Sequence, residues 1–290
     1  MQILNNQDVN SLVKTRNTIG LNIMLSLVYL HDMNKERKPR ILITNDDGIH
    51  AKGIQVLIDL LKPYGNLLVV APDKGQSAMS HAITLNNPLH LKQIRNDENL
   101  QIYTCSGTSV DCVKLALNEL ESEKPDFLFS GINHGTNSSI SIIYSGTMAA
   151  ALEGSIHGIT SIGLSVLDYS EQADFSMASH FSNKIVKTIL SNNTNHGVCL
   201  NINFPKVSRE DVKGIKICRQ ARSAWVESFD KRSDPHNRDY YWLTGRFHNH
   251  EPDAQDTDDW ALRNNYISVV PVEVDFTAHD QINELKYLEQ

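Results

Sequence analysis

Several common functional signatures are missing from this 290-residue chain. It contains no GxxxxGK[ST] loop and no GxGxxG after a strand pattern, so nothing in it supports a standard NTPase or a dinucleotide-binding protein. There is no HExxH, and the four cysteines form no CxxC pair and no spacing typical of a zinc site. Cys199 and Cys218 stand in apolar runs, where a small buried thiol is the expected interpretation. Reduced thiols fit a cytoplasmic protein.

Excess positive charge and long apolar runs are also lacking. The net charge of −7 argues against a general affinity for nucleic-acid backbone, so we expect no nucleic-acid duplex as partner. The apolar stretch 19–30 follows Lys14 and Arg16, but it is too short to span a bilayer and no small-residue cleavage site follows it. We therefore expect neither secretion nor a membrane partner. Because a start at Met33 would still give a complete domain, we predict that residues 1–38 form an N-terminal extension of unknown role.

The part of the chain after this extension alternates between two hydrophobic periods. The nearly continuous apolar run 40–44 is typical of a strand buried on both faces, and residues 54–61 carry apolar side chains at helical spacing. A second strand at 67–70 completes a βαβ unit. The same alternation predicts further strands at 100–104, 127–130, 161–166 and 198–204, and helices at 110–121, 147–154 and 178–190. We predict a doubly wound, mostly parallel, Rossmann-like α/β sheet over residues 39–212, with its ligand site beyond the carboxyl ends of the strands.

The pattern changes after residue 212. Strand-like segments at 215–218, 240–244 and 266–274 are separated by long polar connections, which are uncommon inside a compact domain. We predict that residues 213–290 form a β-rich C-terminal arm covered by a partner subunit.

The most informative polar residues are Asp46 and Asp47, directly after the first strand. Two adjacent carboxylates repel each other, so another group has to balance their charge. The alternative is that one of them simply caps the next helix, but a cap needs only one Asp. We favour a metal site, for which Ser77 and Asn133 are candidate partners with oxygen donors. Oxygen ligands suit Mg²⁺, Mn²⁺ or Ca²⁺ rather than structural zinc.

Three other loops could face the same crevice. The serine-rich loop 71–81 also begins at the end of a strand, although by composition alone it would be a solvated turn. The Gly/Asn-rich segment 130–137 can turn sharply beside a ligand, or be an ordinary loop. At 144–147 a helix begins, and its free N–H groups with the hydroxyls of Ser145 and Thr147 would suit phosphate, with a plain helix cap as the alternative.

Two histidines, His81 and His134, fall in these loops. Either could donate a proton to a leaving alcohol, but a hydrogen-bonded loop histidine is the interpretation we favour.

Taken together, these segments resemble the SurE family, the stationary-phase survival proteins that act as 5′- and 3′-nucleotidases. The resemblance runs in family order from about residue 39 to 280. The matching stretches are ILITNDDGI (41–49), APDKGQSAMSHAITL (71–85), SGTSVDCVKLAL (106–117), SGINHGTN (130–137), YSGTMAAALEG (144–154), NINFP (201–205), DPHNRDYYWLTG (234–245) and TDDWALRNNYISVVPVEVDFTA (257–278).

The resemblance implies roles for nine residues. A metal would be held by Asp46, Asp47, Ser77 and Asn133, and phosphate would be contacted by Asn45, Asn137 and the turn Ser145-Gly146-Thr147. It also implies a homodimer or homotetramer assembled through the C-terminal arm. The chain departs from the family pattern at Gln76, where many members have Arg, and at Ser139 and Ser141, which replace a Gly and an acidic residue.

The expected reaction is hydrolysis of nucleoside monophosphates to nucleoside and inorganic phosphate, as in a 5′-nucleotidase that also acts on 3′-nucleotides. Asp46 and Asp47 would be the catalytic residues and hold one divalent ion, Mg²⁺ or Mn²⁺. We favour water as the nucleophile, because carboxylates committed to a metal are poor nucleophiles. One alternative is a receiver-like, Mg²⁺-binding signalling module without turnover, with Asp73 as phosphoacceptor, although no suitably placed Lys stands out. Another is a nucleotide-binding protein without turnover.

Overall fold

The computed structural model describes residues 37–120, 122–170, 172–192 and 197–289. The chain divides into two units, Met1–Pro39 and Arg40–Gln290, and the helices and strands described here all belong to the second. The extension expected at residues 1–38, with its apolar stretch 19–30, lies outside the described residues except for its last two positions. Within the described ranges, no helix combines the length and the apolar composition needed to cross a bilayer.

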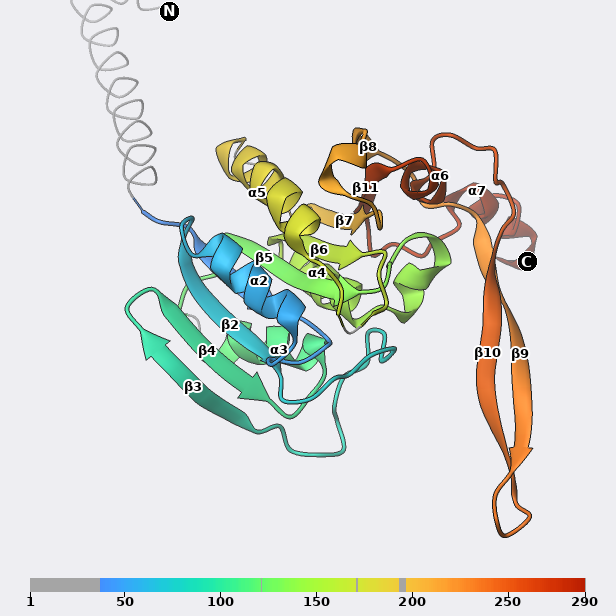
Figure 1. The fold of residues 1–290 in the computed structure, drawn as a ribbon, viewed down its shortest axis with the longest axis horizontal. Coiled ribbons are helices and arrows are strands. Elements are labelled where there is room, and N and C mark those ends of the chain that lie inside the picture. Colours follow the sequence, from blue (N-terminus) through green and yellow to red (C-terminus); the bar gives the residue numbers. More distant parts are fainter. Residues whose placement is uncertain (1–36, 121, 171, 193–196, 290) are drawn as a thin grey trace, which may run out of the picture. The chain divides into compact units, whose positions relative to one another are not determined.

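A nine-stranded sheet forms the centre of this unit, in the order β3-β4-β2-β1-β5-β6-β7-β11-β8 (Figure 1). The six strands from β4 to β7 in this order are parallel to one another, whereas β3 pairs antiparallel with β4 at the edge. The bounds are β1 Arg40–Thr44, β2 Asn66–Pro72, β3 Leu91–Asp97, β4 Leu100–Cys105, β5 Phe127–His134, β6 Thr160–Val166 and β7 Cys199–Phe204. The predicted doubly wound, mostly parallel sheet is confirmed, while β3 was not predicted.

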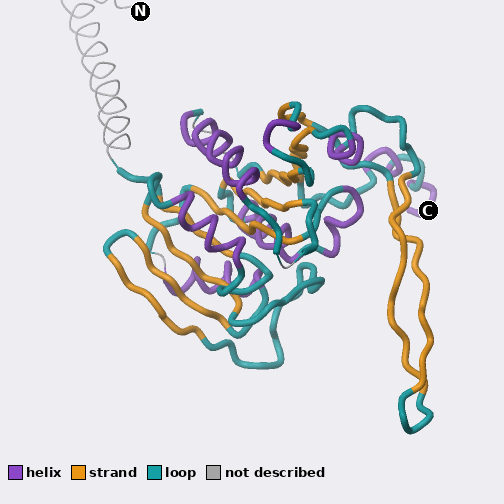
Figure 2. The backbone as a smooth tube through the Cα atoms, viewed as in Figure 1, coloured by secondary structure: helices purple, strands orange, loops and turns teal. Residues whose placement is uncertain are grey.

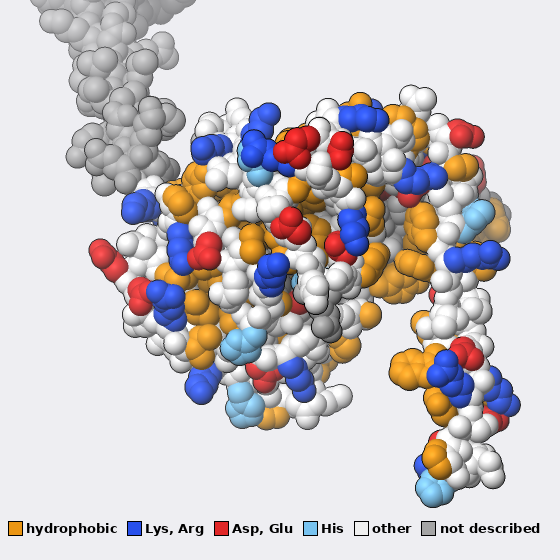
Figure 3. Space-filling model, in the orientation of Figure 1, with side chains coloured by type: hydrophobic (Ala, Val, Ile, Leu, Met, Phe, Trp, Pro, Cys, Tyr) orange, Lys and Arg blue, Asp and Glu red, His pale blue; other side chains and the backbone are white. Residues whose placement is uncertain are grey.

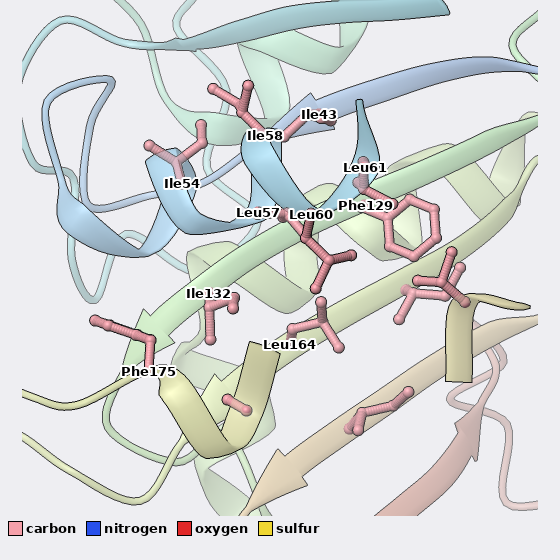
Figure 4. Packing of buried hydrophobic residues seen from close by; sticks show 14 of the residues in the cluster. Ile43, Ile54, Leu57, Ile58, Leu60, Leu61, Phe129, Ile132, Leu164 and Phe175 are labelled. Carbon is pink, nitrogen blue, oxygen red and sulfur yellow. The ribbon is translucent and has the colours of Figure 1, made fainter. Parts of the chain in front are cut away.

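Helices cover both faces of the sheet (Figure 2). On one face, α2 (Lys52–Leu61) and α5 (Ser176–Ser191) pack over a core that contains Ile43 and Phe129 (Figure 4). On the other, α3 (Ser109–Leu115) and α4 (Gly146–Ile156) pack over a separate core. Because successive side chains of a strand point to opposite faces, Leu42 joins the second core while Ile43 joins the first. Burial on both faces explains the continuous apolar runs of the inner strands.

The segment after residue 212 is not one arm. Its strands β8 (Gly214–Ile217) and β11 (Tyr266–Val272) extend the central sheet, where β11 runs antiparallel to β7 and parallel to β8. The side chains of Ile267 and Val269 are part of the first core, so β11 is held there by apolar burial. The short helices α6 (Asp258–Arg263) and α7 (His279–Ile282) also belong to this segment.

Only one part of residues 213–290 leaves the sheet as an arm. It is an antiparallel hairpin of β9 (Ser223–Ser233) and β10 (Asp239–Asn249), which forms a two-stranded sheet of its own and extends away from the nine-stranded sheet (Figures 1 and 2). The structure thus narrows the expected arm from 213–290 to this hairpin.

Candidate functional site

The site lies where the strand order reverses. β1 has β2 on one side and β5 on the other, and ligands of such sheets bind beyond the carboxyl ends of the strands at this point. A pocket of about 430 Å³ opens there. Five of the nine predicted site residues line it, namely Asp46, Ser77, Asn133, Asn137 and Ser145. The remaining lining residues are Ala78, His134, Gly135, Thr136, Ser141, Tyr144, Tyr169 and Trp225.

Asp46 lies at the buried side of this pocket with 5% of its surface exposed. Burial raises the pKa of its carboxyl group to about 6; hydrogen bonding from Thr147 opposes the rise, and the neighbouring charge of Asp47 adds to it. Burial also raises the pKa of Asp47, whose Oδ2 accepts a long hydrogen bond of 3.4 Å from the backbone N–H of His134. Both carboxylates therefore lie in surroundings that disfavour their charge unless a cation is bound.

The start of α4 packs against Asp46. Thr147 is fully buried, and its hydroxyl donates to Asp46 Oδ1 at 2.5 Å. A Cβ at Gly146 would lie 2.7 Å from the Cβ of Asp46, so only glycine lets the helix come this close. Ser145 caps the helix, with its Oγ accepting the N–H of Met148 at 2.9 Å. Within the turn predicted to bind phosphate, Ser145 thus faces the pocket while Gly146 and Thr147 lie against Asp46.

Asn133 is oriented by its own loop at the end of β5. Its Nδ2 donates to the backbone oxygens of His134 at 3.0 Å and Gly135 at 2.8 Å. Both amide hydrogens are therefore engaged, and the amide oxygen is the group of this side chain that remains to bind a cation.

The loop that carries Ser77 is fixed to the site at several points. The backbone N–H of Gln76 donates to the backbone oxygen of Asp46 at 2.7 Å, and Ser80 Oγ donates to the backbone oxygen of Ile143 at 2.6 Å. Further along, His81 pairs with Glu153 of α4 at 3.0 Å. These contacts place the exposed Ser77 beside Asp46, which the sequence could suggest but not show.

The two loop histidines both have partners. Nδ1 of His134 lies 3.0 Å from the backbone oxygen of Ser170. The imidazole ring also makes an edge contact with the ring of Phe175, with 5.0 Å between the two centroids. His81 is bound to Glu153, as described above. Both thus match the hydrogen-bonded interpretation.

The two predicted asparagine contacts differ in their surroundings. Asn45 is buried, and its Nδ2 donates to the backbone oxygen of Gly48 at 2.9 Å, which supports the turn after β1. Asn137 lines the pocket, but its Nδ2 donates to Ser165 Oγ at 2.7 Å and its backbone N–H to Asn203 Oδ1 at 2.8 Å. Asn203 is a positioning residue that our sequence analysis did not identify. The sequence feature that could have identified Asn203 is its place in the stretch NINFP, where a polar side chain stands at a buried position of a core strand.

The donor set can be tested for its fit to a metal ion. In the described part of the chain no three His, Cys, Asp or Glu side chains converge, so a cation at this pocket would be bound by the two carboxylates with hydroxyl and amide oxygens. Such oxygens are the ligands preferred by Mg²⁺, Mn²⁺ and Ca²⁺. The raised carboxyl pKa values and the free amide oxygen of Asn133 both fit a hard divalent cation.

Comparison with known proteins connects this geometry to a family. A family model described as Survival protein SurE matches residues 41–227. The chain belongs to the SurE family. A protein named 5′-nucleotidase SurE from Flavobacterium johnsoniae is 56% identical over 252 residues, covering 87% of this chain and 97% of the relative. Another of that name, from Cytophaga hutchinsonii, is 49% identical over 249 residues, covering 86% and 96%.

A solved structure agrees with the fold. The crystal structure of the SurE protein from Aquifex aeolicus is similar with a TM-score of 0.74 and 37% identity, covering 87% of this chain and 100% of that chain. The resemblance noted from the motifs is thereby confirmed, and so is the doubly wound fold.

The base of the hairpin completes the pocket of this SurE-family chain. Ser223 Oγ accepts the backbone N–H of Ile140 at 3.1 Å, and Asp258 Oδ2 accepts the N–H of Ser139 at 2.6 Å. These bonds tie β9 and α6 to the loop after β5, and they bring Trp225 to the pocket. Because these contacts join residues far apart in sequence, our sequence analysis missed Trp225. It also gave no role to Tyr144 or Tyr169, which line the same pocket.

Proposed function

We propose that the chain hydrolyses nucleoside monophosphates to nucleoside and inorganic phosphate, as a metal-dependent 5′-nucleotidase with additional 3′-nucleotidase activity. The observation that carries the proposal is the pair Asp46 and Asp47 at the switch point of the sheet, in surroundings that raise both carboxyl pKa values. Its SurE relatives bear the name 5′-nucleotidase. The proposed class is therefore a phosphomonoesterase.

Four residues are proposed to hold one divalent cation, Mg²⁺ or Mn²⁺. They are Asp46, Asp47, Ser77 and Asn133, of which all but Asp47 line the pocket directly. When bound there, such an ion would act as a Lewis acid and would lower the pKa of a water molecule. Thr147 fixes the rotamer of Asp46 through its hydroxyl, and the loop of Asn133 presents the amide oxygen. With both carboxylates engaged as ligands, water is the nucleophile we favour.

The phosphate group is proposed to lie beside Ser145 and Asn137, which line the pocket. The N-terminal turn of α4 adds its positive dipole end, which favours an anion. We reassign Thr147, because its buried hydroxyl donates to Asp46 and is not directed at the pocket. Gly146 and Asn45 contribute through the backbone, by allowing the close approach of α4 and by holding the turn after β1.

The hairpin is proposed as the contact that forms a homodimer or homotetramer. Beyond its base it exposes a series of large apolar side chains, and patches of this kind mark protein interfaces. Figure 3 shows hydrophobic side chains among charged and other polar ones along it. The exposed apolar residues are Val226, Phe229, Tyr240, Tyr241, Trp242 and Leu243. Light scattering of the wild type and of a chain lacking residues 226–246 tests this, and a monomeric wild type would contradict it.

We also propose a cytoplasmic location. The four cysteines are free and buried, which is the usual state of thiols in a reducing compartment.

A phosphate-release panel tests the proposed reaction. It uses 5′- and 3′-nucleoside monophosphates, each with Mg²⁺, Mn²⁺ or Ca²⁺, and we expect release with at least one ion. A protein that binds Mg²⁺ but releases no phosphate from any nucleotide would favour the signalling alternative instead. The SurE relatives do not support that alternative, and none of the residues lining the described pocket is a lysine.

A further inference from the structure

Three aromatic side chains stand at the mouth of the metal pocket. Tyr144, Tyr169 and Trp225 line it together with Asp46, and they expose 47%, 68% and 37% of their surfaces. Inorganic phosphate and a metal ion need charges and polar donors, which the buried side of the pocket already supplies. A wall of accessible aromatic rings is suited to a flat apolar group attached to the phosphate.

The ring of Tyr169 is held in place by the loop of the site itself. A Cβ at Gly135 would lie 2.3 Å from its Cε1, so the ring packs on backbone that only glycine leaves open. Gly135 also has a positive φ of 90°, and its N–H donates to the backbone oxygen of Asp168 at 3.0 Å. The residue before Tyr169 is therefore tied to the loop that carries Asn133.

Trp225 reaches the pocket from β9, the first strand of the hairpin. It lies directly opposite Phe247 in the hairpin, and the two rings meet edge to face at 5.9 Å and 72°. Two residues earlier, Ser223 is bonded to the backbone of Ile140 beside the pocket. The indole thus has a fixed support behind it and still exposes part of its surface.

We propose that Tyr169 and Trp225 form the nucleobase subsite, against which the base of a nucleoside monophosphate stacks while its phosphate lies at Asp46. This inference rests on the proposed function. Stacking on aromatic side chains tolerates any base because every base has a π-face. Purines should bind better than pyrimidines, since they cover more of the rings. A pocket of about 430 Å³ falls within the usual range for small-ligand sites.

The test compares two phosphate esters that differ only in the base, adenosine 5′-monophosphate and ribose 5-phosphate. Tyr169→Ala and Trp225→Ala should each lower kcat/KM for the nucleotide about tenfold, mainly through KM, as expected for the loss of one stacking contact. Activity on ribose 5-phosphate should stay within about twofold. The conservative Trp225→Phe should retain most of the nucleotide activity. Phe276→Ala removes an 88% exposed ring outside the pocket and serves as the matched control.

A second readout does not depend on turnover. Adenosine should quench the tryptophan fluorescence of the wild type, and Trp225→Phe should abolish the quench while Trp242→Phe retains it. If neither ester is cleaved by the wild type, the proposed function fails, and the fluorescence titration still decides on base binding. Equal losses on both esters, unchanged nucleotide kinetics in the alanine variants, or a quench that survives Trp225→Phe would each overturn the assignment.

Discussion

Replacing Asp46 with asparagine should stabilise the metal-free protein and at the same time remove its response to a divalent cation. Asparagine has nearly the same shape, and its amide oxygen can still accept the hydroxyl of Thr147. It carries no charge, so it avoids both the cost of burial and the repulsion from Asp47 that raise the pKa of Asp46. The variant separates the role of the carboxylate in binding from its cost to the fold.

The size of the effect follows from the pKa. The carboxyl group has an ordinary pKa of 3.8 and one of about 6 in the fold, and each pH unit between them corresponds to about 1.4 kcal/mol. The folded state binds the proton more tightly than the unfolded state, so ionisation of Asp46 lowers the free energy of unfolding. This loss of stability is absent at a pH below the lower pKa, grows between the two pKa values and is constant above the upper one. Above the upper value it reaches at most about 3 kcal/mol. For a chain of this length, a gain of about 2 kcal/mol raises Tm by roughly 4–8 °C.

Thermal unfolding in EDTA at about pH 8 and about pH 4 measures this difference. The gain in Tm for Asp46→Asn should be present at the higher pH and largely absent at the lower one. Saturating Mn²⁺ should stabilise the wild type by about 2.7 kcal/mol at a hundred times its Kd, and the variant much less. Asp253→Asn makes the same charge change at an exposed position and should leave Tm nearly unchanged. If Asp46→Asn is less stable than the wild type in EDTA at the higher pH, the reasoning on buried charge is refuted.

Three further changes test the start of α4 and the N-terminal extension. Gly146→Ala places a Cβ 2.7 Å from that of Asp46 and should lower phosphate release at least tenfold, measured with saturating metal; full activity would show that α4 can withdraw without cost. Ser145→Ala should weaken phosphate binding about tenfold in calorimetry, the equivalent of one charge-assisted hydrogen bond, while Mn²⁺ affinity changes less; the opposite order would make Ser145 a helix cap alone. Removing residues 1–32 should leave activity and Tm almost unchanged, because the first strand begins at Arg40, and an insoluble product would show that the extension belongs to the fold.

The central sheet could be predicted because its inner strands are buried on both faces. The apolar runs at 40–44 and 198–204 carry this signal, and both are strands of the parallel core. The edge strand β3 has no such signal, since its residues are nearly all exposed and include Lys92, Arg95 and Asp97. The hairpin strand β9 was missed for the same reason. β8 and β11 belong to the main sheet because they pair with segments distant in the sequence, and local sequence patterns do not predict such pairings.

In the candidate site too, local sequence patterns predict some residues, whereas others are brought in by contacts between distant segments. Asp46 and Asp47 could be singled out because they are adjacent and follow a buried strand. The hydrogen bond from Thr147 to Asp46 joins residues 101 positions apart, so the sequence suggested phosphate as the partner of that hydroxyl. Tyr169 and Trp225 reach the pocket through Gly135 and through the hairpin, respectively. Neither contact has a local signature, and the aromatic wall is therefore visible only in the structure.

Metal add-back to the stripped protein tests directly whether Asp46 and Asp47 anchor a divalent cation that the reaction needs. The wild type and Asp47→Asn are treated with EDTA and desalted, and phosphate release from adenosine 5′-monophosphate is followed while Mn²⁺ or Mg²⁺ is titrated back. We predict that the stripped wild type is inactive and regains activity along a saturable curve, and that Asp47→Asn stays nearly inactive although circular dichroism shows it folded. Full activity of the stripped wild type in EDTA, or of Asp47→Asn at the same ion concentration, would contradict the assignment of Asp46 and Asp47 as the anchors of the metal site.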